Sequence, residues 1–439
     1  MLPLYTGKLP PEQFGLYDLA VTVISLSVPV VFFQIWDGMF RYTFEKQEKG
    51  EKYRIVSNSF FVWAAGFLIY SAAFLICKAF WPGLSWFIFL YGISVAIQYQ
   101  YTFIARAFLK NRLFVASGLL NSILNAIANI VLILVFHIGM ESLYIASILG
   151  CTAQVLMIEM KLRPLRHFHL NGIYLKEIKE MLYFSMPMCM ATILYWLLSG
   201  YTKVAISQQL GTYSNGLYAV ANRFTSMLMF IIAVFQYAWN EMAYLMAREE
   251  NRTEKYKKSL EYILKVVLLG CAIFMLLTKI IFPFFVDPSY DDALMLVPLS
   301  LTGVAANALA GFIDTIFLAE KKTRWTFRTT ILGAGLNIAG LWIFTPIWGL
   351  QGAIGALCLA FMALAVFRII VLSRVFNIKL YGSDSIYIFL LAAGVGMFYL
   401  VNQLQWLVVV ILLLCGISVI SLRGLIVPLC RGLVKKRKP

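Results

Sequence analysis

Long uninterrupted apolar runs constrain this chain more than any other feature of its sequence. Runs of 18–25 residues recur along the whole length. Each run is long enough to cross a hydrocarbon core of about 30 Å as a helix that rises about 1.5 Å per residue. The composition agrees, because 61% of the residues are hydrophobic and 13% are charged, whereas soluble domains average about 45–50% and about 25%. The sequence therefore predicts an all-α, polytopic membrane protein.

Thirteen membrane spans are expected. They lie near residues 15–37, 57–79, 84–105, 114–136, 142–160, 181–206, 215–239, 260–282, 293–318, 326–346, 352–374, 386–402 and 404–422.

The net charge of +16 is explained by membrane topology rather than by nucleic acid. If the residues before the first span lie outside the cell, the loops on the inner side hold 32 of the 37 Lys and Arg residues, with the loop at 367–379 among them. Basic residues are held on the cytoplasmic side of membrane proteins, where they also attract anionic lipid head groups. We expect a multi-pass protein with a cytoplasmic C-terminus and no nucleic-acid partner.

Short matches in the same order indicate an internal repeat. Gly15-Leu16-Tyr17 recurs as Gly216-Leu217-Tyr218, 201 positions later, and Lys110-Asn111-Arg112 aligns with Lys322-Thr323-Arg324, 212 positions later. Both copies run in the same direction across the membrane. The pattern predicts two homologous bundles related by a pseudo-two-fold axis along the membrane normal, as in carriers that alternate access.

The repeat also predicts the domain boundaries. Span 181–206 has no counterpart in the first copy, so we expect a further helix before Met1 to complete two six-helix bundles, followed by two extra helices. The expected parts are an N-terminal transmembrane bundle at 1–160, a cytoplasmic linker at 161–180, a C-terminal transmembrane bundle at 181–376, and an extra helix pair with a basic cytoplasmic tail at 377–439.

Four pieces of the sequence carry a family resemblance. "LPLYTGKLPPEQFGLYDL", "NGLYAVANRF", "PSYDDALMLVPL" and "IWGLQGAIGAL" resemble bacterial oligosaccharide flippases of the Wzx type. These flippases belong to the multidrug/oligosaccharidyl-lipid/polysaccharide exporter superfamily, which includes multidrug and toxin extrusion (MATE) carriers and lipid II flippases. The resemblance extends over nearly the whole chain, apart from the absent first helix.

The resemblance implies a carrier in the bacterial cytoplasmic membrane. It would flip a polyprenyl-pyrophosphate-linked oligosaccharide from the inner to the outer leaflet by alternating access, for a capsule, an exopolysaccharide or O-antigen. Expected partners are the lipid bilayer, a polysaccharide polymerase and other assembly proteins. No cofactor is implied, and coupling to protons or sodium stays open. Two alternatives remain, a lipid II flippase and a MATE-type multidrug exporter.

The residues themselves argue against an enzyme. A membrane polymerase needs a large external loop for its catalytic groups, and no external loop here exceeds about fifteen residues. No cluster of histidines, cysteines and acids has metal-ligand spacing. We therefore predict neither catalytic residues nor a metal site.

Arg223 is the strongest candidate for substrate binding. It lies about two turns inside an apolar span, together with Asn222, and a cation there is costly to insert and usually faces a cavity. Its guanidinium suits a pyrophosphate, although a salt bridge between the two bundles is the structural alternative. Asp18 corresponds to Ala219, one turn from Arg223, and is its candidate partner in coupling or gating.

A second candidate face lies on the span at 181–206. Thr192, Trp196, Ser199 and Lys203 share one side of the helix, where an indole and a cation would suit a saccharide. The alternative is that Lys203 merely extends to the interface.

Two further positions complete the candidate residues. Asn125 belongs to a ladder at 117, 121, 125 and 129, whose polar groups either line water or bond neighbouring helices. Asp314 lies near a cytoplasmic helix end. Solvation at the interface is the simpler interpretation for Asp314, and coupling or gating is the functional one.

Overall fold

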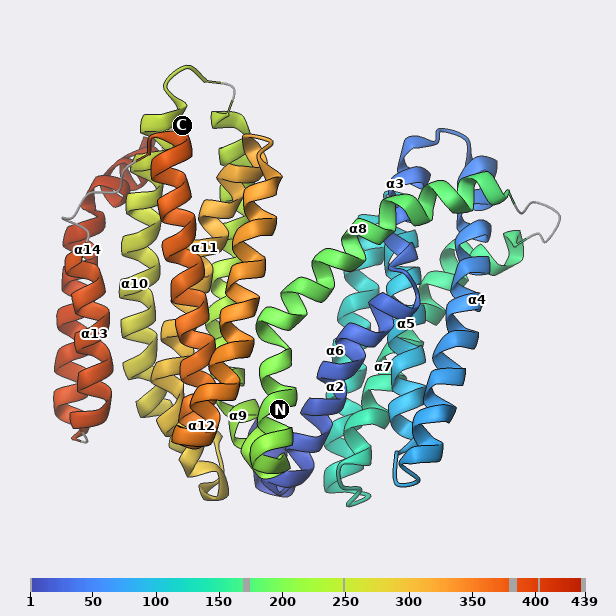
Figure 1. Cartoon of the computed structure of the whole chain (residues 1–439), viewed down its shortest axis with the longest axis horizontal. Coiled ribbons are helices and arrows are strands. Elements are labelled where there is room, and N and C mark those ends of the chain that lie inside the picture. Colours follow the sequence, from blue (N-terminus) through green and yellow to red (C-terminus); the bar gives the residue numbers. More distant parts are fainter. Residues whose placement is uncertain (1, 169–173, 248, 379–384, 402, 436–439) are drawn as a thin grey trace. The chain divides into compact units, whose positions relative to one another are not determined.

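Helices form nearly all of the chain that the structure describes. The computed structural model in Figure 1 describes residues 2–168, 174–247, 249–378, 385–401 and 403–435. The α-helices are α1 (Leu2–Lys8), α2 (Pro11–Val31), α3 (Ile35–Glu45), α4 (Lys49–Phe80), α5 (Trp86–Ala107), α6 (Asn111–Leu134), α7 (Glu141–Leu162), α8 (Leu175–Ser199), α9 (Tyr201–Met246), α10 (Arg252–Phe285), α11 (Val297–Ala319), α12 (Thr323–Phe376), α13 (Ser385–Leu400) and α14 (Leu404–Lys435). The short 3-10 helices are η1 (Pro164–His167) and η3 (Pro288–Leu296).

Among the described residues, eleven helices are long and apolar enough to cross a membrane. The chain is thus an all-α, multi-pass membrane protein, as predicted. The thirteen spans predicted from the sequence exceed this number by two, because α12 contains two of them and α13 is an apolar helix too short to be among the eleven.

Three backbone breaks divide the longest helical stretches. Gly211 (φ 86°, ψ 173°) interrupts α9, between the predicted spans 181–206 and 215–239. Gly349 (φ 57°, ψ −137°) interrupts α12, between the predicted spans 326–346 and 352–374. Both breaks agree with the prediction of separate spans on either side.

A third break was not predicted. The expected span at 15–37 ends early, because Phe33 (φ 54°) and Gln34 (φ 48°) adopt left-handed conformations between α2 and α3. Such a conformation is uncommon for residues other than glycine. The buried Phe32 side chain next to this break packs against Trp63 and Tyr70 of α4.

The chain divides into two compact units. The first contains residues 3–9 and 16–196, and the second contains residues 10–15 and 197–439. In the first unit, α7 packs against both α5 and α6, and α3 packs against α4 and α5. Its core is rich in large side chains, including Phe32, Trp36, Tyr70 and Tyr101.

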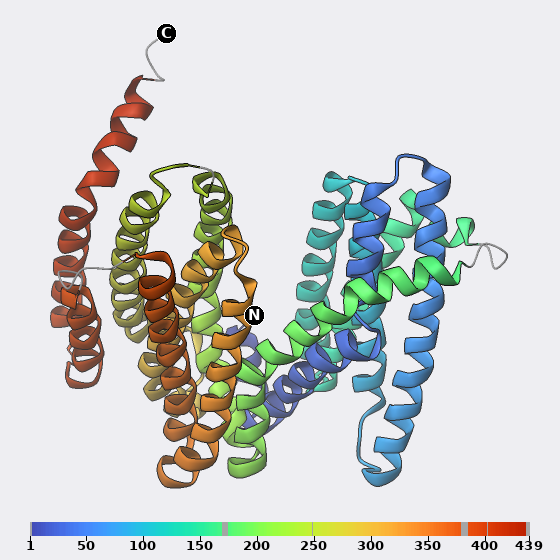
Figure 2. The same ribbon diagram turned by 45° about the horizontal axis from the view of Figure 1, so that its top comes forward.

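The second unit is built around α11. This helix packs against α9, α10 and both parts of α12, while α13 and α14 pack against α10 (Figures 1 and 2). One buried cluster consists of Leu198, Ala310, Ala334, Ala360, Phe361, Leu364 and Ala365. Small residues at such contacts let membrane helices approach closely, which favours van der Waals packing where lipid provides no hydrophobic drive.

Two turns, one in each unit, share the same backbone geometry. Phe108 and Glu320 both have φ −84° and ψ 9°, and the residues that follow them have φ values of 56° and 57°. In each turn the next lysine donates its backbone N–H to a carbonyl five residues earlier, Lys110 to Ala105 and Lys322 to Phe317. The two turns are 212 positions apart, which is the offset of the predicted repeat at this point.

Candidate functional site

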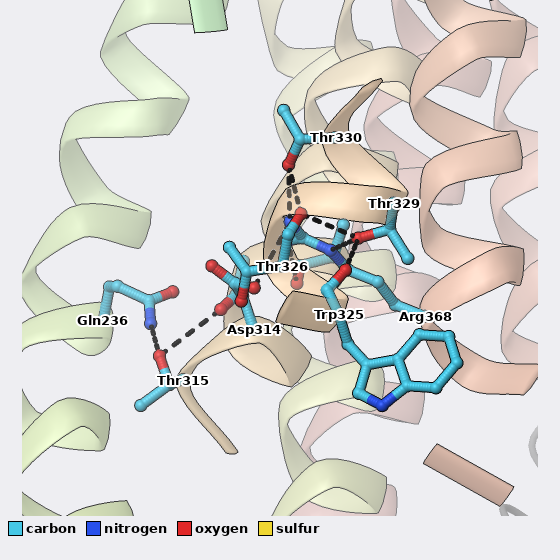
Figure 3. A network of polar contacts seen from close by, with 10 residues as sticks. Gln236, Asp314, Thr315, Trp325, Thr326, Thr329, Thr330 and Arg368 are labelled. Atoms are coloured by element: carbon cyan, nitrogen blue, oxygen red, sulfur yellow. Dashed lines mark hydrogen bonds and ion pairs between the residues drawn. The ribbon is translucent and has the colours of Figure 1, made fainter. Parts of the chain in front are cut away.

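A largely buried set of polar contacts lies in the second unit, around Arg368 (Figure 3). Arg368 is in the second part of α12, and only 6% of its side chain is exposed. Its Nη2 atom lies 3.3 Å from Oδ1 of Asp314 on α11, whose side chain is 20% exposed. The ion pair therefore joins two neighbouring helices in a largely buried place.

Neutral oxygen atoms accept further hydrogen bonds from the guanidinium of Arg368. Nη1 donates to the backbone carbonyl of Ala310 at 2.8 Å. Nε donates to the hydroxyl of Thr329 at 3.2 Å, and Nη2 donates to the hydroxyl of Thr330 at 3.2 Å. Both threonines lie in the first part of α12. One cation thus binds α11 and both parts of α12, which explains how the charge is tolerated at this depth.

A second group of hydrogen bonds adjoins the ion pair along α11. Thr315 donates to the Oδ1 atom of Asn240 at 2.9 Å and accepts a hydrogen bond from Gln236 at 2.9 Å. Gln236 also donates to Asn240 at 3.0 Å. Gln236 and Asn240 belong to α9, so this group connects α9 to α11 beside Asp314 (Figure 3).

The structure corrects two interpretations from the sequence. Arg368 was counted among the basic residues of an inner loop, but it is buried inside α12. Asp314 was preferred as an interfacial, solvated carboxylate, but it is mostly buried and ion-paired. The signal that could have identified Arg368 is its position within the apolar run 352–374 itself, because an arginine inside such a run needs a partner.

Arg223 has the surroundings expected of an accessible cation. It lies on α9 with an exposed side chain, and its Cζ atom is 5.8 Å from the centre of the Phe14 ring. No ion pair to Arg223 occurs in the described parts of the chain. Asn222, its neighbour in sequence, is half-buried and accepts a hydrogen bond from Thr225 on its side-chain oxygen.

The face that contains Trp196 and Lys203 is divided between the two units. The indole N–H of Trp196 donates to the carbonyl of Thr22 at 3.0 Å, and Thr192 donates to Gln34 at 3.0 Å. These polar groups therefore hold α8 against the segment that contains α2. Lys203 is half-buried near the start of α9, in the second unit.

The asparagine ladder bonds neighbouring helices. Asn125 donates to Ser147 of α7 at 3.1 Å and accepts from Asn129 at 2.9 Å. Asn121 donates to Gln154 of α7 at 2.9 Å. Of the two interpretations left open for Asn125, the hydrogen bonds match the one in which amides join helices.

Asp18 is buried in α2, with 7% of the residue exposed. It belongs to the first unit, and Arg223 belongs to the second. Their proximity remains a prediction.

Comparison with known sequences decides the family. The profile of a family described as "Polysaccharide biosynthesis protein" matches residues 1–239, just over half of the chain. The chain belongs to the polysaccharide biosynthesis protein family. A search of curated protein sequences gives no match.

Solved structures show that this family member shares a fold with known flippases and exporters. It superimposes on the lipid II flippase MurJ in an inward closed conformation with a TM-score of 0.69 and 15% identity, covering 97% of this chain and 95% of MurJ. An inward-facing multidrug resistance MATE family transporter of the MOP superfamily gives a TM-score of 0.71 and 15% identity. This match covers 83% of this chain and 90% of the transporter. An outward-facing multidrug resistance MATE family transporter gives a TM-score of 0.56 and 14% identity. This match covers 83% of this chain and 87% of the transporter.

These comparisons confirm the resemblance derived from the sequence. The polysaccharide biosynthesis protein has a MATE-like and MurJ-like all-α fold. Its family and its fold also agree with the prediction that the chain is not an enzyme.

Proposed function

We propose that this polysaccharide biosynthesis protein carries a polyprenyl-pyrophosphate-linked oligosaccharide from the inner to the outer leaflet of the membrane. The family supports a role in polysaccharide assembly, and the fold is one that a lipid II flippase also uses. A lipid-linked saccharide has a polar head group that the bilayer core excludes, so its carrier must offer cations and polar groups inside the membrane.

Arg223 is the observation that carries this proposal. An arginine within a membrane-length helix costs about 2.5–3.5 kcal/mol on insertion scales, and such a cost is tolerated where the residue has a function. Its guanidinium contacts an aromatic ring and is exposed, so its donors are available for a ligand. Two parallel N–H groups match the oxygens of a pyrophosphate. We assign Arg223 to the binding of the pyrophosphate, together with its sequence neighbour Asn222 and with Lys203, which lies before the break at Gly211 in α9.

The buried pair of Asp314 and Arg368 supports a second role within the same cycle. Coupling or gating needs an element with two arrangements of different free energy. A carboxylate that is paired with a buried cation provides such an element, because protonation of Asp314 would remove its attraction for Arg368. We infer that this pair is the coupling or gating element of the second unit, and that Asp18, which is buried in α2, has a coupling or gating role in the first.

The Arg223→Ala substitution tests the assignment. Surface polysaccharide would be measured in cells that lack the gene and carry each variant, together with the amount of protein in the membrane. We expect Arg223→Ala to lower polysaccharide export at least about tenfold, because hydrogen bonds to a charged group contribute about 1.5–3 kcal/mol. Arg223→Lys should retain part of the activity, since it keeps the charge but loses the planar fork.

A matched control separates this effect from general loss of charge. Arg374 is exposed near the end of α12, and Arg374→Ala should leave export unchanged. Wild-type export in the Arg223→Ala variant would refute the assignment of Arg223.

A further inference from the structure

The two equivalent turns differ in how their charges are compensated. In the second unit, Glu320 forms an ion pair with Arg252 at 3.1 Å, and the ammonium of Lys322 lies 4.7 Å from the centre of the Phe376 ring. In the first unit, Phe108 occupies the position of Glu320. The first turn therefore has the backbone of the second turn without its acid.

Three cations surround a cavity at this first turn. The cavity has a volume of about 650 Å³, and Lys110, Arg112 and Lys161 line it from the start of α6 and the end of α7. All three side chains are exposed. Within the described residues none of them takes part in an ion pair. Glu159 is the acid nearest to Lys161 in sequence, and it accepts a hydrogen bond from the hydroxyl of Tyr101 at 2.9 Å.

The start of α6 strengthens the positive potential of this cavity. Lys110 is the N-cap residue of α6 and its side chain makes no capping hydrogen bond. The first helical turn of α6 contains no acidic residue. The free N–H groups and the helix dipole place a partial positive charge at the same end. The three positive side chains and the positive end of the α6 dipole repel one another. An anion that binds between them would reduce this electrostatic repulsion.

The apolar surroundings indicate that the anion is attached to a lipid. Leu109, Leu113 and Leu162 line the cavity beside the three cations, and Asn111 completes its wall. Below the cavity, an exposed stripe at residues 115, 119, 123 and 127 follows one face of α6, and each of these side chains is between 52% and 58% exposed. Arg112 precedes this stripe by three residues and shares its face. Acyl chains can therefore lie along α6 while the head group reaches the cations.

We propose that the cavity of Lys110, Arg112 and Lys161 binds the phosphate of an anionic phospholipid. Basic pockets beside membrane helices are suited to such head groups on the cytoplasmic side, where the charge distribution places this turn. A zwitterionic lipid is less suitable, because its own ammonium neutralises its phosphate. The site is separate from the transported substrate and does not depend on the function proposed above.

Native mass spectrometry of the purified full-length chain tests this site. The protein in detergent micelles would be mixed with equal amounts of phosphatidylglycerol and phosphatidylcholine that carry the same acyl chains, and the retained lipids would be counted. We expect the wild type to retain phosphatidylglycerol in preference to phosphatidylcholine. The triple variant Lys110→Gln, Arg112→Gln, Lys161→Gln should reduce this preference about tenfold or more, because each basic side chain near an anionic head group adds to the attraction.

A second triple variant provides the control. Lys49→Gln, Lys176→Gln and Lys179→Gln remove the same charge from exposed positions of the first unit that do not line the cavity. This variant should retain phosphatidylglycerol as the wild type does. Equal retention of phosphatidylglycerol by the wild type and by the cavity variant would overturn the proposal.

Inorganic phosphate and pyrophosphate distinguish a lipid from a soluble anion. Thermal unfolding of the wild type and of the cavity variant would be compared with each salt and with phosphatidylglycerol in the micelles. We expect phosphatidylglycerol to raise the melting temperature of the wild type more than that of the cavity variant, with no such difference for the two salts. Stabilisation by the salts alone would mean that the cavity holds a soluble anion, which would also overturn the proposal.

Discussion

Arg368 shows how a single charge can organise a membrane-embedded unit. Its guanidinium contacts a carboxylate, two hydroxyl groups and a backbone carbonyl on α11 and α12. Removing one partner would leave the other charge buried without compensation. Breaking a buried ion pair in this way is costly, whereas replacing both partners by apolar side chains is much less so.

We therefore expect non-additive effects on stability at this pair. Arg368→Met and Asp314→Leu should each lower the free energy of unfolding by about 3–5 kcal/mol. The double variant should lose clearly less than the sum of the two single variants. Thermal unfolding in detergent micelles, followed by tryptophan fluorescence, measures this difference. Additive losses would show that the two groups do not interact energetically.

Export by the same double variant separates a structural from a functional role. If the pair is a coupling or gating element, the double variant should fold and reach the membrane but fail to export polysaccharide. Normal export by a stable double variant would contradict the role in coupling and leave the pair as a structural contact.

The two arginines also show what the sequence could reveal at this scale. Arg223 could be singled out because it lies well inside an apolar run, where the cost of inserting a cation makes it a candidate for a functional role. Arg368 lies six residues before the end of a run at residue 374. Counting basic residues by loop assigned it to the cytoplasm, and its partners on α11 and the first part of α12 become apparent only when the helices are packed.

At the scale of helices, the repeated Gly-Leu-Tyr motif marks a close contact within the second unit. A Cβ atom added to Gly216 of α9 would lie 2.0 Å from the carbonyl oxygen of Pro11, and one added to Gly15 would lie 2.0 Å from that of Thr212. Asn215 donates to the carbonyl of Gly15 at 2.7 Å. The glycines of the two motifs thus lie where backbone packs against backbone, which explains why both positions are glycine.

A methyl group at this contact should be destabilising. We expect Gly216→Ala to lower the melting temperature and to reduce export, because overpacking typically costs about 1–3 kcal/mol. Gly118→Ala on α6 is the control, since nothing lies within 4 Å of the added Cβ atom. Alanine in a helix interior is favoured over glycine by about 0.5–1 kcal/mol, so the control should be neutral or slightly stabilising. An equal response of both variants would show that the contact is looser than the structure indicates.

The break in α12 gives a second prediction for a helix. Gly349 has φ 57° and ψ −137°, a conformation that is strained for any residue with a side chain. Gly349→Ala should destabilise the protein by about 1–3 kcal/mol, whereas Gly335→Ala, within the regular part of the same helix, should not. Melting temperatures of the two variants measure the difference, and unchanged stability in Gly349→Ala would show that the break can relax.

The helix breaks differ in how far the sequence could predict them. Gly349 and Gly211 each lie between two predicted spans, so a glycine that punctuates apolar runs was a sufficient signal. The break at Phe33 and Gln34 carries no glycine of its own. The buried Phe32 ring beside it packs against Trp63 and Tyr70 of α4, a contact that becomes apparent only when the helices are packed.

At the scale of the whole molecule, the family was accessible from the sequence, while the two-fold repeat stays a prediction. The offset of 212 positions between "KNR" and "KTR" is matched by two turns with the same backbone angles. The family profile and the shared fold agree with the resemblance carried by the motifs. Charge compensation differs between the two turns, because Glu320 pairs with Arg252 in the second turn and Phe108 stands at the equivalent position in the first.

One measurement tests the proposed transport most directly. Polyprenyl-linked lipids would be extracted from cells that lack this gene, and from the same cells with the wild-type gene restored, and analysed by mass spectrometry. We expect a polyprenyl-pyrophosphate that carries a complete oligosaccharide to accumulate without the gene, and to fall when the gene is restored, as surface polysaccharide returns. An unchanged lipid pool, together with greater retention of organic cations in the cells without the gene, would contradict the proposal and indicate a drug exporter.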